Sequence, residues 1–331
     1  RKRRAFKGAG KVGPPSGDVT TKVRVAPRPF LDHVTAAAMN LRRAVLVPIL
    51  VALATLPLFA ADTPAPARPK LGSTVFVWED LKVRPSAVGE RRDVANNPTD
   101  TLSVFECHIT TLNPGKSSHL PHRHPQEELI IVKEGTLEVH IDGRTQRAGP
   151  GSVFFYASNH AHAVTNVGDT RATYWVINLA TPVTHTPDRH NRTPTLPSGV
   201  FDWQQLKVQP TKTGEKRDVL KGSTVTMESL TCHVTTVKPR EASHAAHRHP
   251  DDELVIVKEG TLDITINDRT YRATTGSVCL FTSNDLHGMR NAGDTQASYY
   301  VIRMITSATP KVAKKATQVL ASKAPISDRN S

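Results

Sequence analysis

Short apolar runs alternate with turn-forming residues along most of the chain after residue 100. Asn113-Pro114-Gly115 and Asp142-Gly143 are such turn signals, and no segment between them keeps a long helical period. Short runs at this spacing are typical of an antiparallel barrel or a double-sheet jelly roll. In the first half of the pattern the predicted strands are Leu102–Thr111, Glu128–Lys133, Thr136–Ile141, Ser152–Tyr156, His162–Asn166 and Ala172–Asn178.

The whole pattern occurs twice. Equivalent residues lie 125 positions apart, as Trp78 and Trp203 do, and no insertion or deletion is needed to keep this offset. A repeat of this size is long enough to form a domain of its own. We therefore expect an all-β chain with two tandem jelly-roll barrels, at residues 75–181 and 200–307, joined by a Pro-rich linker at 182–199.

The segment before the repeats has two parts. Residues 1–38 are basic and show no sustained period, so they are predicted to be disordered. Residues 39–61 begin with Met39, continue with two arginines and an apolar run, and end in small residues, which is the order of a secretory signal peptide. A retained membrane anchor is the alternative, although prolines interrupt a run that is barely long enough to span. We expect cleavage, a linker at 62–74, no stable membrane span afterwards, and a periplasmic or secreted protein.

The formal net charge of +13 lies in the ends of the chain. The stretch at 1–38, the start of the signal peptide and a basic tail at 308–331 account for it, and the remaining body is neutral. Nucleic-acid-binding domains gather basic residues on a folded surface, so nucleic acid is not expected as a partner. The three cysteines lack CxxC spacing and are expected to be buried thiols, without a disulfide framework or zinc knuckle.

One polar stretch that interrupts the apolar runs carries recognisable chemistry. His122 and His124 are separated by one residue, and alternate side chains of a strand point to the same face. Pro125 ends that strand and Glu128 begins the next one, so a hairpin can bring its carboxylate back to both imidazoles. The second repeat has an equivalent set, which comprises His247, His249 and Glu253.

With these residues in place the chain resembles a bicupin, a protein with two cupin barrels in tandem. The first cupin motif, Gly-(x)5-His-x-His-(x)3,4-Glu-(x)6-Gly, is matched from Gly115 to Gly135 with one extra residue after the first glycine. The second motif, Gly-(x)5-Pro-x-Gly-(x)2-His-(x)3-Asn, is matched from Gly151 to Asn166 at its first glycine, histidine and asparagine. The departures concern turns, as where Arg240 replaces the opening glycine in the second repeat.

The resemblance implies one metal ion in each barrel, held by three histidines and one glutamate. The implied ligands are His122, His124, Glu128 and His162 in the first barrel and His247, His249, Glu253 and His287 in the second. Imidazole and carboxylate ligands suit a divalent transition metal, with Mn or Fe expected first and Ni, Cu or Zn as alternatives. Four protein ligands leave positions on a six-coordinate ion for water, dioxygen or a chelating substrate.

The fold alone does not determine the reaction. We expect an exported metal-dependent enzyme, a dioxygenase or decarboxylase, that acts on a small carboxylate-bearing molecule. The resemblance to oxalate decarboxylases rests on the tandem barrels and the two complete ligand sets, and their lid-borne acidic proton donor is not identifiable in this sequence. The alternative is a non-catalytic cupin that binds a small ligand or a sugar. A monomer and a homo-oligomer both remain open.

Some residues near the predicted centres have more than one interpretation. Arg303 either holds a substrate carboxylate through a bidentate contact or lies at the rim or at an interface. Glu127 and Asp252 precede the ligand glutamates and are interpreted as solvated neighbours, with a proton carrier as the alternative. The sequence does not determine to which face of the sheet two strand histidines, His108 and His233, point.

Overall fold

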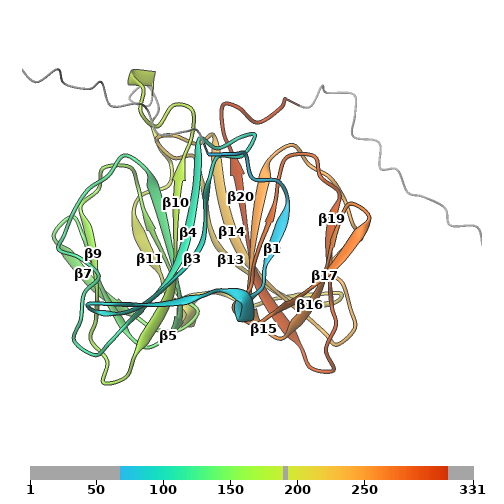
Figure 1. The fold of residues 1–331 in the computed structure, drawn as a ribbon, viewed down its shortest axis with the longest axis horizontal. Coiled ribbons are helices and arrows are strands. Elements are labelled where there is room, and N and C mark those ends of the chain that lie inside the picture. Colours follow the sequence, from blue (N-terminus) through green and yellow to red (C-terminus); the bar gives the residue numbers. More distant parts are fainter. Residues whose placement is uncertain (1–67, 189–192, 312–331) are drawn as a thin grey trace, which may run out of the picture. The chain divides into compact units, whose positions relative to one another are not determined.

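The computed structural model describes residues 68–188 and 193–311. The predicted basic extension, the signal peptide and most of the tail lie outside these ranges. Among the described residues no helix is long and apolar enough to cross a membrane. Apart from short 3-10 turns such as η1 (Trp78–Asp80), the regular structure there consists of antiparallel strands (Figure 1). The predicted all-β class with two tandem jelly-roll barrels is confirmed.

Each repeat contributes ten strands to the described part of the chain. The first repeat has β1 (Thr74–Phe76), β2 (Val83–Ser86), β3 (Gly89–Asn97), β4 (Val104–Leu112), β5 (Glu127–Glu134), β6 (Leu137–Ile141), β7 (Arg144–Ala148), β8 (Val153–Tyr156), β9 (His162–Asn166) and β10 (Ala172–Ala180). The second has β11 (Gly199–Phe201), β12 (Gln209–Thr211), β13 (Gly214–Gly222), β14 (Ser229–Val237), β15 (Asp252–Glu259), β16 (Thr261–Ile266), β17 (Arg269–Thr274), β18 (Val278–Phe281), β19 (His287–Asn291) and β20 (Ala297–Ile305). The six strands predicted in the first repeat are all present, with ends that differ by at most about two residues.

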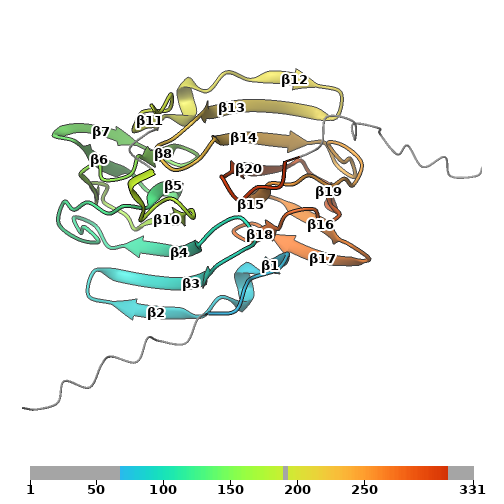
Figure 2. The same cartoon turned by 90° about the horizontal axis from the view of Figure 1, so that it is seen from above.

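The strands of each barrel form one large and one small sheet. The large sheets have the orders β11-β8-β5-β10-β4-β3-β2 and β1-β18-β15-β20-β14-β13-β12, and the small sheets are β7-β6-β9 and β17-β16-β19 (Figure 2). Large and small sheets share one apolar cluster in each barrel, to which Ile130 of β5 and Val139 of β6 belong. The barrel interior therefore lies between the two sheets.

The central strands of the large sheets are buried on both faces. Ile130 and Val132 of β5 point into the barrel interior, whereas Leu129 and Ile131 point to the other face. There they join a cluster that also contains Leu254 and other residues of β15 from the second repeat. Burial on both faces explains why these strands read as continuous apolar runs in the sequence. The alternation also determines which polar residues of a strand face the barrel interior.

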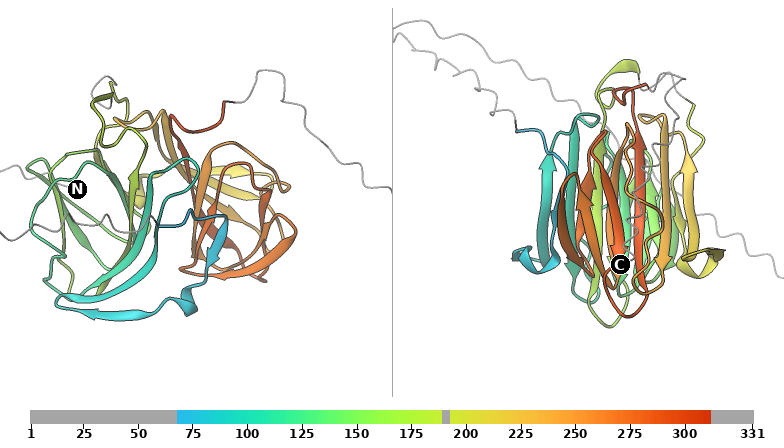
Figure 3. Two further views of the ribbon diagram at one scale, coloured as in Figure 1. Left: turned by 45° about the horizontal axis from the view of Figure 1, so that its top comes forward. Right: turned by 90° about the vertical axis from the view of Figure 1, so that its right-hand side faces the viewer.

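The opening strands of the two repeats are exchanged. β1 pairs with β18 of the second repeat, and β11 pairs with β8 of the first (Figures 2 and 3). The sequence assigned each opening strand to its own barrel, so the ranges 75–181 and 200–307 delimit the repeats and not the barrels. The exchange adds backbone hydrogen bonds across the two repeats, and it makes each barrel incomplete without the other repeat.

Glu127 and Asp252 are buried and are not the solvated neighbours that the sequence suggested. Glu127 Oε2 accepts a hydrogen bond from Thr224 Oγ1 at 2.6 Å, and its Oε1 accepts one from the Thr226 backbone N–H at 3.1 Å. Asp252 accepts the equivalent bond from Thr99 Oγ1 of the first repeat at 2.5 Å, and Thr101 Oγ1 donates to the same oxygen at 2.7 Å. Each of these two carboxylates points to the strand face opposite to that of the predicted ligand glutamate that follows it. There it accepts hydrogen bonds from the other repeat.

Burial gives Glu127 a testable pH dependence. Burial raises the pKa of its carboxyl, although the bonds from Thr224 and Thr226 oppose the rise. A raised pKa means that folding favours the protonated form, so the contribution to stability is present at low pH and is lost as pH rises through the folded pKa. Above pH 4.5 the free energy of unfolding of the wild type should therefore fall relative to that of Glu127→Gln, whose amide mimics the protonated carboxyl. Urea denaturation from pH 4 to pH 8 measures this difference.

Asp252→Asn is the matched variant, because burial also raises the pKa of Asp252. It should show the same trend. A difference in unfolding free energy that stays constant over the pH range would contradict the account for either residue.

Candidate metal centres

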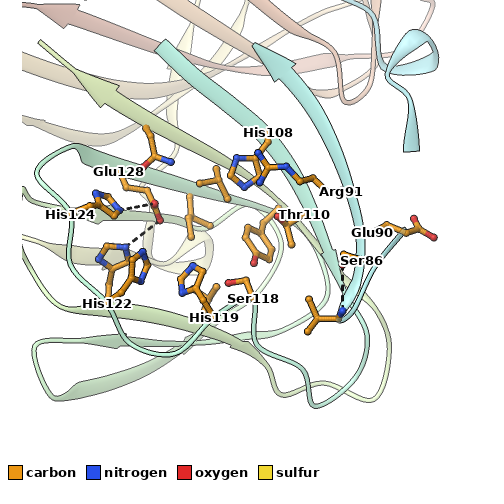
Figure 4. A pocket seen from close by; sticks show the side chains of 17 residues that line it. Ser86, Glu90, Arg91, His108, Thr110, Ser118, His119, His122, His124 and Glu128 are labelled. Atoms are coloured by element: carbon orange, nitrogen blue, oxygen red, sulfur yellow. Dashed lines mark hydrogen bonds and ion pairs between the residues drawn. The ribbon is translucent and has the colours of Figure 1, made fainter. Parts of the chain in front are cut away.

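The first candidate centre lies where the segment before β5 meets β9. His122 forms an isolated antiparallel bridge with His162, and the two residues exchange backbone hydrogen bonds of 3.0 and 3.1 Å. His124 lies outside any strand, so the predicted strand through both histidines is reduced to this single bridge. The bridge still places His122 beside the strand that carries the third histidine, and all three rings line one cavity (Figure 4).

The four predicted ligands of each barrel come together. In the first barrel, ligand atoms of the three histidines lie within 4.8 Å of one another. Glu128 follows the facing of Ile130 into the barrel, and its two oxygens lie 3.3 Å from His124 Nε2 and 3.7 Å from His162 Nε2. The second barrel repeats this geometry, with corresponding separations of 3.2 and 3.8 Å. Its members are His247, His249, Glu253 and His287.

Backbone carbonyls and stacked rings hold the histidines in place. His162 Nδ1 bonds the His160 carbonyl oxygen at 2.9 Å, and His287 Nδ1 bonds the Asp285 carbonyl oxygen at 2.9 Å. A carbonyl only accepts, so Nδ1 carries the proton and the Nε2 lone pair is left for the centre. Tyr156 stacks on His162 with ring centroids 4.3 Å apart, which fixes the plane of that ring.

The donor set fits a metal ion. The Nε2 atoms of His162 and His287 are buried and have no hydrogen-bond partner among the described residues. A buried nitrogen without a partner is costly unless another group satisfies it. Here each such nitrogen faces a carboxylate and two further imidazoles. Three neutral nitrogens and one carboxylate oxygen are what a divalent transition metal takes.

The second centre holds one proton that a metal has to displace. Burial together with the neighbouring imidazoles of His244 and His287 lowers the pKa of His247 to about 4, so this ring is neutral at pH 7. Burial also acts to lower the pKa of His249, but hydrogen bonds to Asp251 and Glu253 outweigh it and raise the pKa to about 9. His249 is therefore protonated in the metal-free centre at neutral pH.

Metal affinity of the second centre should depend on pH. One displaced proton predicts that the apparent association constant rises about tenfold per pH unit up to about pH 9 and then levels off. Chelator competition with Co²⁺ measures this constant in His122→Ala protein, in which the first centre lacks a ligand. Equal affinity at pH 6 and pH 8 would show that His249 is already neutral before the metal binds.

The cavities around the two centres are small. Their volumes are about 290 Å³ in the first barrel and 320 Å³ in the second, at the low end for ligand pockets. His108 lines the first cavity and His233 the second, which settles the facing that the sequence left open. His119 and His244 also line them, next to the first ligand of each set. The cavities suit a small molecule.

Two charged residues that the sequence did not single out distinguish the cavities. Beside the first, Glu106 accepts a hydrogen bond at 2.9 Å from Nδ2 of the lining residue Asn178. Beside the second, Asp251 accepts two bonds from Arg303, both of 2.7 Å. Arg303 thus lines the cavity, as one interpretation required, while two of its nitrogens are engaged by Asp251. A comparison of the two repeats could have identified both acids, because each one is replaced by an uncharged residue at the equivalent position of the other repeat.

His160 is the nearby histidine that stays outside the first centre. Its side chain is 43% exposed, and its Nδ1 lies 2.8 Å from Asp142 Oδ2 and 3.0 Å from Ser198 Oγ. Its counterpart in the second repeat is Asp285, so the histidine is not repeated there. The local Asn-His-Ala-His sequence alone does not separate it from His162, but the strand geometry does.

Comparison with known families agrees with this geometry. Residues 108–178 and 233–303 each match the family model described as Cupin domain. No curated protein shows significant sequence similarity to the chain. Each matched segment begins at the strand histidine of its barrel and ends at the position of Asn178 or Arg303.

Several solved structures are also similar in fold. Oxalate decarboxylase of Lactobacillus farciminis in its formate complex has a TM-score of 0.55 at 14% identity, over 72% of this chain and 88% of that chain. A variant of Bacillus subtilis oxalate decarboxylase has a TM-score of 0.54 at 15% identity, over 72% and 79% of the two chains. AerE from Microcystis aeruginosa has a TM-score of 0.52 at 15% identity, over 68% and 98%. At these identities the likeness concerns the fold.

Proposed function

Because this chain carries two cupin domains in tandem, each with a complete set of three histidines and one glutamate, we propose that it is a metal-dependent enzyme. The reaction is a decarboxylation or a dioxygenation of a small carboxylate-bearing molecule. The observation that carries the proposal is the pair of buried Nε2 atoms, on His162 and His287, that have no hydrogen-bond partner among the described residues. A merely structural histidine would be hydrogen-bonded on both sides.

The residues of the chain have separable tasks in this proposal. The histidines and the glutamate of each barrel would hold the metal, and the bound metal would supply a Lewis acid or a one-electron centre. The backbone bonds to Nδ1 keep the rings of His162 and His287 in the tautomer that offers Nε2. The cavity of about 290 Å³ is at the low end for ligand pockets and therefore suits a small ligand.

Arg303 supports a carboxylate-bearing substrate in the second cavity. Its guanidinium lines that cavity, and Asp251 engages only Nε and one terminal nitrogen. The other terminal nitrogen keeps its two donors for a ligand carboxylate. The first cavity has Asn178 at this position, so the two centres differ in the charge that they offer.

We also propose that the enzyme works outside the cytoplasm, on the evidence of the signal-peptide pattern at 39–61. Expression of the full chain with a reporter after residue 331 would test this through the compartment and the mass of the product. A mature protein that retains residues 39–61 would contradict cleavage.

The enzyme proposal is tested in two steps. Protein expressed with Mn²⁺, and in parallel with Fe²⁺, is assayed for bound metal by elemental analysis, and less than about half an equivalent per chain would contradict two centres. The loaded protein is then given a panel of small carboxylates, while CO₂ release, oxygen uptake and ligand loss are followed. Ligand-induced thermal stabilisation without consumption of ligand or oxygen would favour the alternative, a non-catalytic binding protein.

A further inference from the structure

A carboxylate–imidazole pair lies inside the first barrel and is not part of the ligand set. His108 Nδ1 lies 2.7 Å from Glu106 Oε1, and the same oxygen accepts a bond from Arg91 Nη2 at 3.1 Å. Asn178 Nδ2 donates to the other oxygen at 2.9 Å. Glu106 and His108 are alternate residues of β4, so both point to the barrel interior while Cys107 points to the opposite face.

His108 of this pair lines the cavity of the first centre. Figure 4 shows His108 and Arg91 on one side of the pocket and the ligands His122, His124 and Glu128 on the other. The side chain of His108 is only 12% exposed, so its free nitrogen meets the cavity and little bulk water.

Three donors keep Glu106 ionised. Burial acts to raise the pKa of its carboxyl, but the bonds from His108 and Asn178 and the charge of Arg91 outweigh it and lower the pKa. An ionised carboxylate only accepts hydrogen bonds, so His108 must donate from Nδ1. The arrangement orients the ring and leaves Nε2 to exchange a proton with a ligand.

The second barrel lacks this pair, although the histidine is retained. Thr231 stands where Glu106 does, and among the described residues His233 has no hydrogen bond to a carboxylate. Burial and the charge of Lys216 lower the pKa of His233 to about 4, so this ring is neutral at pH 7. The chain therefore contains its own internal comparison, with one oriented histidine and one that is not.

We propose that Glu106 and His108 form a proton-donating pair that makes the first cavity the site of a proton-consuming decarboxylation. This rests on the proposed enzymatic function and selects the decarboxylation from its two reactions. In the step, the carbon–carbon bond to the carboxylate breaks and CO₂ leaves, while the electron pair stays on the remaining carbon. The proton on His108 Nε2 then forms the new C–H bond, and neutral His108 regains a proton from solvent. Atoms and charge balance without an oxidant.

Matched substitutions in the two repeats test this pair. In metal-loaded protein, His108→Gln should lower kcat for CO₂ release by about 100- to 1000-fold, with KM changed by less than about threefold and bound metal unchanged. His233→Gln, at the equivalent position, should lower kcat by no more than about threefold. Product formed in D₂O should carry one deuterium at the carbon that lost CO₂.

A second readout needs neither metal nor turnover. In metal-free protein, imidazole ¹⁵N shifts should show the Nδ1-protonated tautomer for His108, and Glu106→Gln should remove that preference. Unchanged shifts in Glu106→Gln, loss of metal in His108→Gln, or equal kcat losses in the two glutamine variants would each overturn the pair. Wild-type protein that binds metal but turns over no carboxylate would instead overturn the proposed function, and the role of the pair with it.

Discussion

Replacing His122 and His247 together by alanine is expected to abolish both metal binding and turnover. Each histidine supplies one of three nitrogens that lie within 4.8 Å of one another, and the remaining two nitrogens and one carboxylate make a much weaker site. Loss of a group that merely supports a ligand already costs about 10- to 100-fold in metal affinity, so loss of a ligand should cost at least as much. Elemental analysis should find about two metal ions per wild-type chain, one in each single variant and none in the double variant.

His160→Ala is the control of the same residue type. Its ring lies two residues from His162 but pairs with Asp142 at the surface, so this variant should keep both metals. Thermal unfolding of metal-free protein should differ little between the double variant and the wild type, because His122 and His247 are only partly buried. A double variant that retains two bound ions would show that other residues hold the metal.

The clustering of the candidate ligands could be predicted because most of them belong to short local patterns. His122, His124 and Glu128 lie within seven consecutive positions, and His162 opens a strand whose limits match the prediction at both ends. Successive side chains of β5 point to opposite faces, so Glu128 points to the same barrel interior as Ile130. Such information is local in sequence, so it does not depend on how the repeats contact each other.

The polar strands were missed for a physical reason. β2 is exposed at all four positions, and β7 is exposed at four of its five. They form by hydrogen bonding to β3 and β6 at the edges of the sheets, without the apolar alternation by which strands are recognised.

Contacts between the repeats could not be predicted from the sequence. A duplicated pattern is compatible both with β1 on its own barrel and with β1 on the other, since β8 and β18 are similar in sequence. The burial of Glu127 has the same origin, because its strand face is covered only by the second repeat. Glu106 and Asp251 could not be assigned a role before the facing of β4 and the partner of Arg303 were known.

A tryptophan follows each exchanged strand and contacts the other repeat. Trp78 follows β1, and its backbone N–H donates to Ser277 Oγ at 3.1 Å; Trp203 makes the equivalent bond to Ser152 at 3.1 Å. A Cβ atom added to Gly276 would lie 2.4 Å from the Trp78 ring. The absence of a side chain at this glycine is therefore what lets the tryptophan approach the turn.

Gly276→Ala is accordingly expected to be among the most destabilising single substitutions in the chain. Gly276 has a φ of +101°, which alone costs an alanine about 1–2 kcal/mol, and the added Cβ would lie 2.4 Å from the rigid Trp78 ring. Overpacking adds about 1–3 kcal/mol. The free energy of unfolding, measured by urea denaturation, should fall by about 2–5 kcal/mol.

Gly143→Ala separates the two contributions, because Gly143 has a φ of +80° and nothing lies within 4 Å of its added Cβ. It should lose only the backbone part. In a Trp78→Ala background the clash is gone, so Gly276→Ala should then cost no more than Gly143→Ala does, which a double-mutant cycle measures. If Gly276→Ala lowered the free energy of unfolding equally with and without Trp78, the tryptophan would not contact this turn closely enough to clash. The exchanged strand would then be stabilised by its pairing with β18 alone.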